Sequence, residues 1–252
     1  KVKFKGLQER ARAKIEQIAE ARGLTAEELA DRLVPDLGLD ESGSLVLDFG
    51  PRKFTVTFDE ALKPVVTCSA ADAATALDGG GKRLRDLPKP NKSDDAEKAA
   101  VAVATWKVLK KDGKTVASGQ LLRLELAMCS QRRWSQEVFD RLRVHHPLLI
   151  HLGRRLVWGA YDPRSNARLA SFRVAPDRSL ADVKDAQYTL PRGATVGIVH
   201  RLELGDDEAA AWRQILGDYE IVQPFAQLSR QATAPTEEER EGMAIDRADG
   251  LT

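Results

Sequence analysis

Along this chain, segments with apolar residues at helical spacing are followed twice by segments in which apolar and polar residues alternate. This order of helix and strand patterns limits the folds that the chain can adopt. Residues 7–19 and 26–34 carry apolar side chains at helical spacing, and "TAEE" forms a capping box at the start of the second helix. Residues 44–59 then alternate apolar and polar side chains around a Gly-Pro turn, which predicts a β-hairpin. Residues 65–68 predict a third strand of a small β-meander.

A second helical region follows the proline-rich, polar segment "LPKPNKSDD" at residues 87–95, where we place an internal boundary. Apolar residues over 99–110 trace one face of a helix that is expected to end near Gly113. The segment "QLLRLELAMC", residues 120–129, is apolar almost all round, as expected of a buried helix. Pro147 is placed to begin a further helix through Trp158.

The spacing becomes alternating again after Trp158. Residues 159–174 predict a strand, a turn and a strand, and residues 195–204 alternate with His200 on the apolar side of a further strand. A helix is expected over 206–217. The chain is therefore predicted to be α+β, with an N-terminal helix pair and small β-meander, central helices, and a C-terminal antiparallel sheet with a packing helix. The predicted parts are 1–87, 88–230 and an acidic helical tail over 231–252.

Composition excludes several classes of protein. The chain has no apolar run of the length a membrane helix needs, and its basic N-terminus lacks the features of a signal peptide, so we expect a soluble, cytoplasmic protein without a membrane partner. Cys68 and Cys129 lie far apart in segments of different character, which favours reduced thiols. The chain begins at Lys1, and its first methionine is Met128, so we expect a piece of a longer protein.

Charge is unevenly distributed although the formal net charge is only +1. Residues 132–168 contain eight arginines and three acidic residues, whereas the chain from Glu203 onward contains twelve acidic residues and four arginines. This segregation predicts either an anionic partner or neutralisation within the chain, with the acidic end docked on the basic middle.

The stretch "HHPLLIHLGRRLVW", residues 145–158, concentrates the most usable chemistry. Two metal ligands on one helix face need a spacing of three or four residues, whereas His146 and His151 are five apart, so no metal site is predicted. On a helix over 148–158 the polar side chains form a single stripe. This stripe is the first candidate for binding an anion or a partner, and it consists of His151, Arg154, Arg155 and Trp158.

Further candidates lie near the C-terminus. His200 on an apolar strand face is either a buried acid or base, or a core histidine with a hydrogen-bond partner. Gln223, Gln227 and Arg230 either surround a small polar ligand or fasten a closing segment to the core. "DGGGKR" lacks the spacing of a phosphate loop, and no nucleophile motif is present, so no cofactor and no catalytic residue is predicted.

Several long segments occur together in a recognisable order: "EELADRLVPDLGLDESGSLVLDFGPRKFTV", "LPKPNKSDD", "RLELAMCSQRRWSQEVF", "HPLLIHLGRRLVWGAYD" and "DYEIVQPFAQLSR". The chain thereby resembles a bacterial family of domains of unknown function, found in large proteins of the type labelled molybdate metabolism regulator (MolR), often with a WGR domain. The resemblance covers residues 27–230. Its regulator label implies a role in transcription or molybdate control and gives no mechanism.

These observations favour a non-catalytic scaffold or regulatory interaction module of a larger bacterial protein. Its partners are expected to be other domains of the same polypeptide, or another protein. One alternative is a nucleic-acid-binding module that uses the arginines of residues 132–168 with neighbouring aromatic residues. A second alternative is an enzyme for a small anionic or nucleotide substrate. Its site would then contain His151, Arg154, Arg155, His200 and Arg230.

Overall fold

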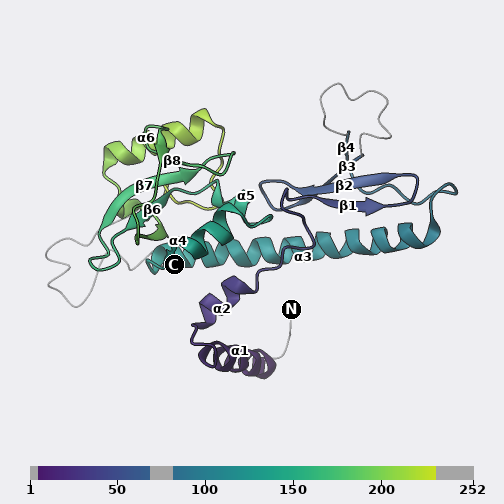
Figure 1. The fold of residues 1–252 in the computed structure, drawn as a ribbon, viewed down its shortest axis with the longest axis horizontal. Helices are drawn as coiled ribbons and strands as arrows, with labels where there is room; N and C mark the ends of the chain where they lie inside the picture. The colour runs from purple at the N-terminus through teal and green to yellow at the C-terminus, as the bar shows by residue number, and fades with distance from the viewer. Residues whose placement is uncertain (1–4, 69–81, 231–252) are drawn as a thin grey trace, which may run out of the picture. The chain divides into compact units, whose positions relative to one another are not determined.

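The computed structural model describes residues 5–68 and 82–230. It confirms the α+β prediction: six α-helices and two antiparallel sheets are formed within the described ranges (Figure 1). The chain divides into two compact units, the first comprising Lys1–Gly119 and Arg141–His151 and the second Gln120–Asp140 and Leu152–Thr252. The tail predicted over 231–252, and its docking on the basic middle, lie outside the described residues. The boundaries predicted at residues 87 and 230 stay a prediction.

The N-terminal helix pair of the first unit is α1 (Lys5–Glu20) and α2 (Ala26–Arg32). Thr25 and Glu28 cap α2 reciprocally: Thr25 Oγ1 accepts from the Glu28 amide at 3.1 Å, and the Glu28 carboxylate accepts from the Thr25 amide at 2.8 Å. Gly23 takes a positive φ of 64° after α1, a conformation that costs glycine little. The capping box read from "TAEE" is therefore confirmed.

The β-meander of the first unit contains β1 (Leu45–Asp48), β2 (Lys53–Phe58) and β3 (Pro64–Cys68), as predicted, and a short fourth strand, β4 (Arg83–Leu84). The strands lie in sequence order, each antiparallel to the next. Alternation puts one face of the sheet in the core, where the buried strand residues are Leu47, Phe54, Val56, Phe58 and Val66.

Helix α3 (Ala96–Cys129) is continuous over 34 residues, so the helix end predicted near Gly113 is wrong. A Cβ atom at Gly113 would lie 2.8 Å from the Phe58 ring, which makes this glycine a point of close packing against the sheet. Glycine inside a helix costs about 1 kcal/mol relative to alanine, and α3 nevertheless continues through Gly113. Residues 120–129 are also buried on one side only, since Leu122 and Leu126 are more than half exposed, which corrects the prediction of an all-round buried segment.

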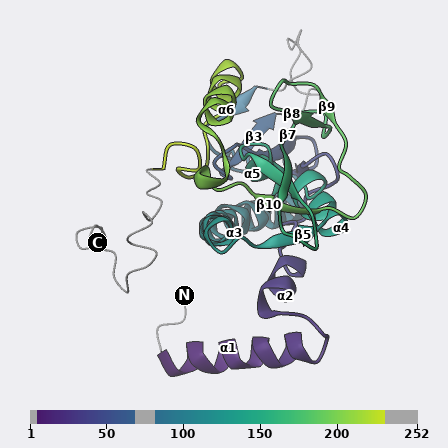
Figure 2. The same ribbon diagram turned by 90° about the vertical axis from the view of Figure 1, so that its left-hand side faces the viewer.

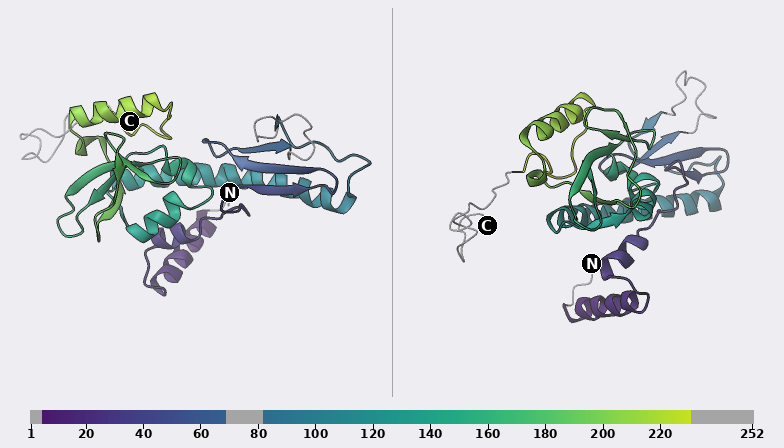
Figure 3. Two further views of the ribbon diagram at one scale, coloured as in Figure 1. Left: turned by 45° about the horizontal axis from the view of Figure 1, so that its top comes forward. Right: turned by 60° about the vertical axis from the view of Figure 1, so that its left-hand side comes forward.

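The second unit contains a six-stranded antiparallel sheet whose strands are not in sequence order. Across the sheet the order is β5 (Arg133–Ser135), β10 (Thr195–Ile198), β6 (Trp158–Tyr161), β7 (Arg168–Val174), β8 (Leu180–Asp182) and β9 (Gln187–Tyr188). Helix α6 (Asp206–Asp218) lies over one face of this sheet and buries Trp212 and Leu216, as predicted (Figure 3).

The helix predicted from Pro147 to Trp158 is wrong. Only α5 (Ile150–Gly153) is helical there, and Trp158 already begins strand β6. The chain leaves the helix because Val157 is held in an extended arrangement: its carbonyl oxygen accepts from the Val199 amide at 3.2 Å and from the Gln227 side chain at 2.7 Å. Sheet pairing has thus overridden the local helical pattern.

Short helical turns connect the longer elements. Helix α4 (Gln136–Phe139) begins at the capping side chain of Ser135 and continues into the π-helical segment η2 (Asp140–Val144). The strand predicted over 195–204 ends at Ile198 and is followed by the 3-10 turn η3 (Arg201–Glu203). Among the helices of residues 5–68 and 82–230, none is both long and apolar enough to cross a membrane.

The contact between Gly113 and Phe58 can be tested against Gly119, a glycine of the same helix where an added Cβ atom would meet nothing within 4 Å. Gly113→Ala is expected to lower the free energy of unfolding by about 1–2 kcal/mol, because overpacking outweighs the gain in helix propensity. Gly119→Ala is expected to raise it by up to about 1 kcal/mol. Urea denaturation followed by circular dichroism measures both, and changes of the same sign would contradict the close contact.

Candidate functional site

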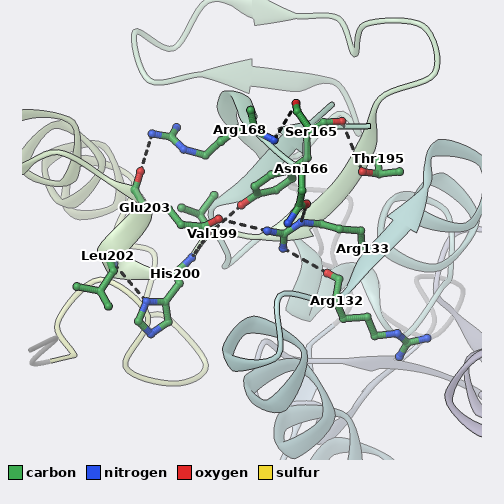
Figure 4. Close-up of polar contacts among 12 residues, drawn as sticks. Arg132, Arg133, Ser165, Asn166, Arg168, Thr195, Val199, His200, Leu202 and Glu203 are labelled. Atoms are coloured by element: carbon green, nitrogen blue, oxygen red, sulfur yellow. Dashed lines mark hydrogen bonds and ion pairs between the residues drawn. The ribbon is translucent and has the colours of Figure 1, made fainter. Parts of the chain in front are cut away.

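A group of charged contacts in the described part of the second unit surrounds Arg133 on β5 (Figure 4). Gly197 of β10 is paired with both Arg133 of β5 and Gly159 of β6. A Cβ atom at Gly197 would lie 2.5 Å from Arg133 Nη1, and one at Gly159 would lie 2.6 Å from the Tyr161 ring. The two paired glycines therefore leave the space on this sheet face that the arginine and tyrosine side chains fill.

Within that space the Arg133 guanidinium stacks on the Tyr161 ring, with its central carbon 3.5 Å from the ring centroid. Tyr161 is fully buried. A desolvated cation over an aromatic face is attracted by the ring quadrupole and is worth up to about 2 kcal/mol. Burial raises the pKa of the Tyr161 phenol, and the carboxylate of Glu203 raises it further, so the hydroxyl stays protonated.

Glu203 is the acceptor that gathers these donors. Its carboxylate accepts from Arg133 Nη2 at 3.2 Å, from the Tyr161 hydroxyl at 3.0 Å and from the His200 backbone amide at 2.7 Å. The last bond closes the turn η3 and places the carboxylate over the sheet. A carboxylate engaged by three donors inside the fold is suited to holding segments together.

A second arginine, Arg168 of β7, connects the same region to α6. Its two terminal nitrogens donate to the two oxygens of Glu208, each at 2.7 Å, and Nη2 also donates to the Glu203 backbone oxygen at 2.9 Å. Ser171 donates to Glu208 and accepts from Trp212 Nε1 at 2.8 Å. Burial raises the pKa of Glu208, but the hydrogen bonds from Arg168 and Ser171 outweigh that effect and lower it. We call Arg133, Tyr161, Arg168, Glu203 and Glu208 the arginine clamp.

Arg154 and Arg155, which were predicted to share one polar stripe, form hydrogen bonds to two different segments. Arg154 Nη2 donates to the Pro176 carbonyl oxygen at 2.5 Å, and burial lowers the pKa of this arginine. Arg155 Nε donates to the Val222 carbonyl oxygen at 2.6 Å. The stripe on a helix over 148–158 therefore does not exist, because the backbone turns after Gly153 and separates the two side chains.

The two other members of the predicted stripe also lie elsewhere. Trp158 is fully buried, donates from Nε1 to the Gly153 carbonyl oxygen at 2.8 Å, and packs edge-on against Trp134 and Phe139. His151 is half-buried in α5, in the part of that helix that belongs to the first unit.

His200 and Arg230 both lie in the second unit, where the charge of Arg230 acts on the His200 ring. His200 follows the end of β10, so its predicted place on an apolar strand face is wrong. Its Nδ1 accepts from the Leu202 amide at 3.2 Å, and burial, together with the charge of Arg230, lowers its pKa. Arg230 itself pairs with Glu125 and donates to Cys129 Sγ at 3.3 Å.

The two glutamines bind protein groups. Gln227 is fully buried, and its side-chain amide makes hydrogen bonds with backbone groups as a neighbouring strand would. It donates to the carbonyl oxygens of Val157 and Val199, at 2.7 and 2.9 Å, and accepts from the Val157 amide at 3.0 Å. Gln223 donates to Gln227 at 2.7 Å and accepts from the Leu228 amide. These contacts satisfy buried backbone groups, which is the fastening role predicted as one alternative for this segment.

Sequence reasoning misses the arginine clamp as a unit. Arg133 and Arg168 belong to the basic middle and Glu203 to the acidic end, but the pairing across 70 residues depends on the sheet order. Glycines in the middle of two adjacent strands, Gly159 and Gly197, are the signal that could have found it, since such positions mark a close approach. In the described part of the chain no group of three or more metal-ligating side chains is found.

The clamp predicts a large effect for a small change. Glu203→Gln removes the charge and replaces one acceptor oxygen with a donor, which leaves Arg133 and Tyr161 poorly satisfied. We expect the free energy of unfolding to fall by about 2–3 kcal/mol, less than for a fully buried pair because both side chains retain some exposure. Glu220→Gln, at an exposed position, is the control and is expected to change it by less than about 0.5 kcal/mol. Equal effects in chemical denaturation would contradict the clamp.

His146 of the first unit predicts a pH dependence. Its Nδ1 accepts from the amides of Leu148 and Leu149, both at 3.2 Å, and its Nε2 lies 3.4 Å from the Val34 carbonyl oxygen. Burial lowers the pKa of His146 in the folded protein, so below about pH 6.5 the unfolded chain binds more protons. The free energy of unfolding should fall as the pH drops through this range and level off below the lowered pKa.

His146→Asn keeps an acceptor at this position and removes the titrating group. The difference between the wild-type and variant curves of unfolding free energy against pH isolates the contribution of His146. It should be flat above about pH 7 and slope below about pH 6.5. A difference that stays flat throughout would show that folding does not lower the pKa of His146.

Comparison with known proteins places the chain in a family. The model of a family described as "Domain of unknown function (DUF4132)" matches residues 81–251. The "Uncharacterized protein YehI" of Escherichia coli (strain K12) is 40% identical over 252 residues, which are 99% of this chain and 20% of that protein, so the chain spans about one fifth of this relative's length. No solved structure matches. With most of its length matched by the family model, the chain belongs to the DUF4132 family.

Proposed function

We propose that this chain is a non-catalytic scaffold or regulatory interaction module of a larger bacterial multidomain protein of the MolR-like, WGR-associated type, acting in the cytoplasm. Its partners are other domains of the same polypeptide, or another protein. The length of the E. coli relative, five times the span matched by this chain, supports a role as one part of a long polypeptide.

The observation that carries this proposal is the internal use of the polar side chains of the second unit. Arg133 and Arg168 are bonded to Glu203 and Glu208, and Arg154 donates to a backbone carbonyl. Gln227 uses both ends of its amide on backbone groups. Side chains that stabilise strand order in this way serve a rigid framework, because recruiting them to a ligand would leave buried partners unsatisfied.

The same contacts weigh against both alternatives. A nucleic-acid surface needs arginines directed at phosphates, whereas the clamp arginines of the basic middle are directed at carboxylates. An enzyme for an anionic substrate needs His200 and Arg230 to face a shared cleft, whereas Arg230 is engaged by Glu125 and Cys129. We therefore favour the scaffold over both.

Amide hydrogen exchange tests the proposal. The 252-residue chain by itself and the same segment within the full-length polypeptide should differ in protection at contiguous surface segments, since an interaction module is covered by its neighbours. We expect slower exchange in the long polypeptide at one or more such segments and unchanged exchange at buried strands such as β6. Identical protection everywhere would overturn the proposal.

A binding measurement separates the alternatives. Fluorescence anisotropy with labelled duplex and single-stranded DNA at low salt should show no saturable binding to the chain. Tight binding that weakens steeply with added salt would replace the scaffold by the nucleic-acid hypothesis.

A further inference from the structure

Helix α1 carries an apolar stripe that the first unit leaves exposed. Leu7, Ala11, Ile15 and Ile18 fall on one face, since successive residues of a helix are about 100° apart. The exposed fractions of Leu7, Ile15 and Ile18 are 53%, 43% and 40%. The one buried residue of α1 is Ala19, and α1 packs against α2. Figure 2 shows how far α1 extends beyond α2.

An amphipathic helix of this kind is stabilised mainly by what covers its apolar face. Helices of about 15 residues are marginal in water by themselves, and packing of the apolar face supplies most of their stability in proteins. Helix α1 has 16 residues, with no acidic residue in its first turn and no basic residue in its last turn. Charges at its ends therefore add little to the stability of the helix. The stripe is therefore a surface that is built to be covered.

Charges are arranged around the stripe in a defined way. Arg10 and Lys14 form a row along one side of it, and Arg12 lies on the other side, next to Ala19. The acidic residues lie on the opposite face of the helix, and they are Glu9, Glu16 and Glu20. The apolar stripe thus has a basic rim, with its carboxylates turned away.

We propose that α1 docks onto an acidic amphipathic helix of a neighbouring domain, a helix whose apolar side chains are flanked by Asp and Glu. Charge complementarity identifies this occupant: carboxylates beside the partner's stripe would meet Arg10, Arg12 and Lys14 as the stripes close on each other. The inference rests on the proposed interaction-module function and names the chemistry of the partner.

A second copy of the chain is a poor occupant. When two α1 helices meet face to face, the rims along both stripes are basic, so Arg10 and Lys14 of each copy approach like charges. Like charges across an interface are unfavourable, and these side chains are too close to the apolar contact to be well screened.

A membrane surface is also a poor occupant. Helix α1 contains four basic and three acidic residues, so its net charge is only +1, which gives little attraction to anionic lipid. It also lacks the aromatic residues that anchor interfacial helices.

The test uses the full chain and a synthetic peptide of the length of α1, with a leucine stripe flanked by rows of glutamate. Fluorescence anisotropy at low salt should show saturable binding of this peptide, weakened by added salt. A peptide with lysine in place of every glutamate should bind at least about tenfold more weakly. Equal binding of both peptides, or of neither, would overturn the proposal.

Variants locate the contact. Arg10→Glu with Lys14→Glu should weaken binding of the acidic peptide at least about tenfold and should strengthen binding of the basic peptide. Ile15→Gln should weaken binding of both. Lys107→Glu with Lys111→Glu makes the same change in net charge at the same spacing on the exposed side of α3 and should leave binding unchanged. Circular dichroism verifies that all three variants are folded.

Two further measurements distinguish other occupants. Dimers in sedimentation that dissociate on Ile15→Gln would assign the stripe to a second copy and overturn the proposal. Co-sedimentation with phosphatidylserine vesicles in preference to the peptide would assign it to a membrane and also overturn the proposal. Exchange protection in the long polypeptide at other segments but not at α1 would overturn this inference and leave the scaffold function standing. Protection nowhere would remove the scaffold function itself.

Discussion

The carboxylate of Glu203 is the group on which the second unit's arrangement depends. It lies in the turn after β10, yet it holds Arg133 from β5 and the Tyr161 hydroxyl from β6, the two strands on either side of β10. Arg168 extends the contact by donating to the backbone of the same turn and to Glu208 of α6. One short turn therefore connects three strands and the helix above them, and the basic middle of the chain is neutralised at these points from within.

Local signals are enough for the elements that depend on neighbouring residues. The Thr25–Glu28 capping box and the alternation of β1 and β2 are complete within a few residues, so the sequence reveals them. Gly113 is misleading as a helix end, because the glycine allows close packing against the Phe58 ring, more than 50 residues away in the sequence. Helical spacing after Pro147 misleads because the backbone of Val157, directly before β6, is held by the side chain of Gln227, 70 residues later. Local patterns lose wherever a distant contact supplies more stabilisation.

The candidate site divides in the same way. Gln227 is recognisable from the sequence as a residue with a choice between ligand and backbone, and its position between Val157 and Val199 requires the structure. The arginines are recognisable as cations that need partners, which follows from the cost of burying charge. Their partners are not recognisable, because the order β5-β10-β6 brings together strands that lie far apart in the sequence.

The paired glycines of β6 and β10 place a limit on how this fold can vary. Gly159 and Gly197 hold open the space that Arg133 and Tyr161 occupy, so a larger residue at either position is compatible only with a smaller one at the other end of the contact. These four positions therefore depend on one another: a side chain at Gly159 would displace the Tyr161 ring, and one at Gly197 would displace the Arg133 guanidinium and with it the bond to Glu203.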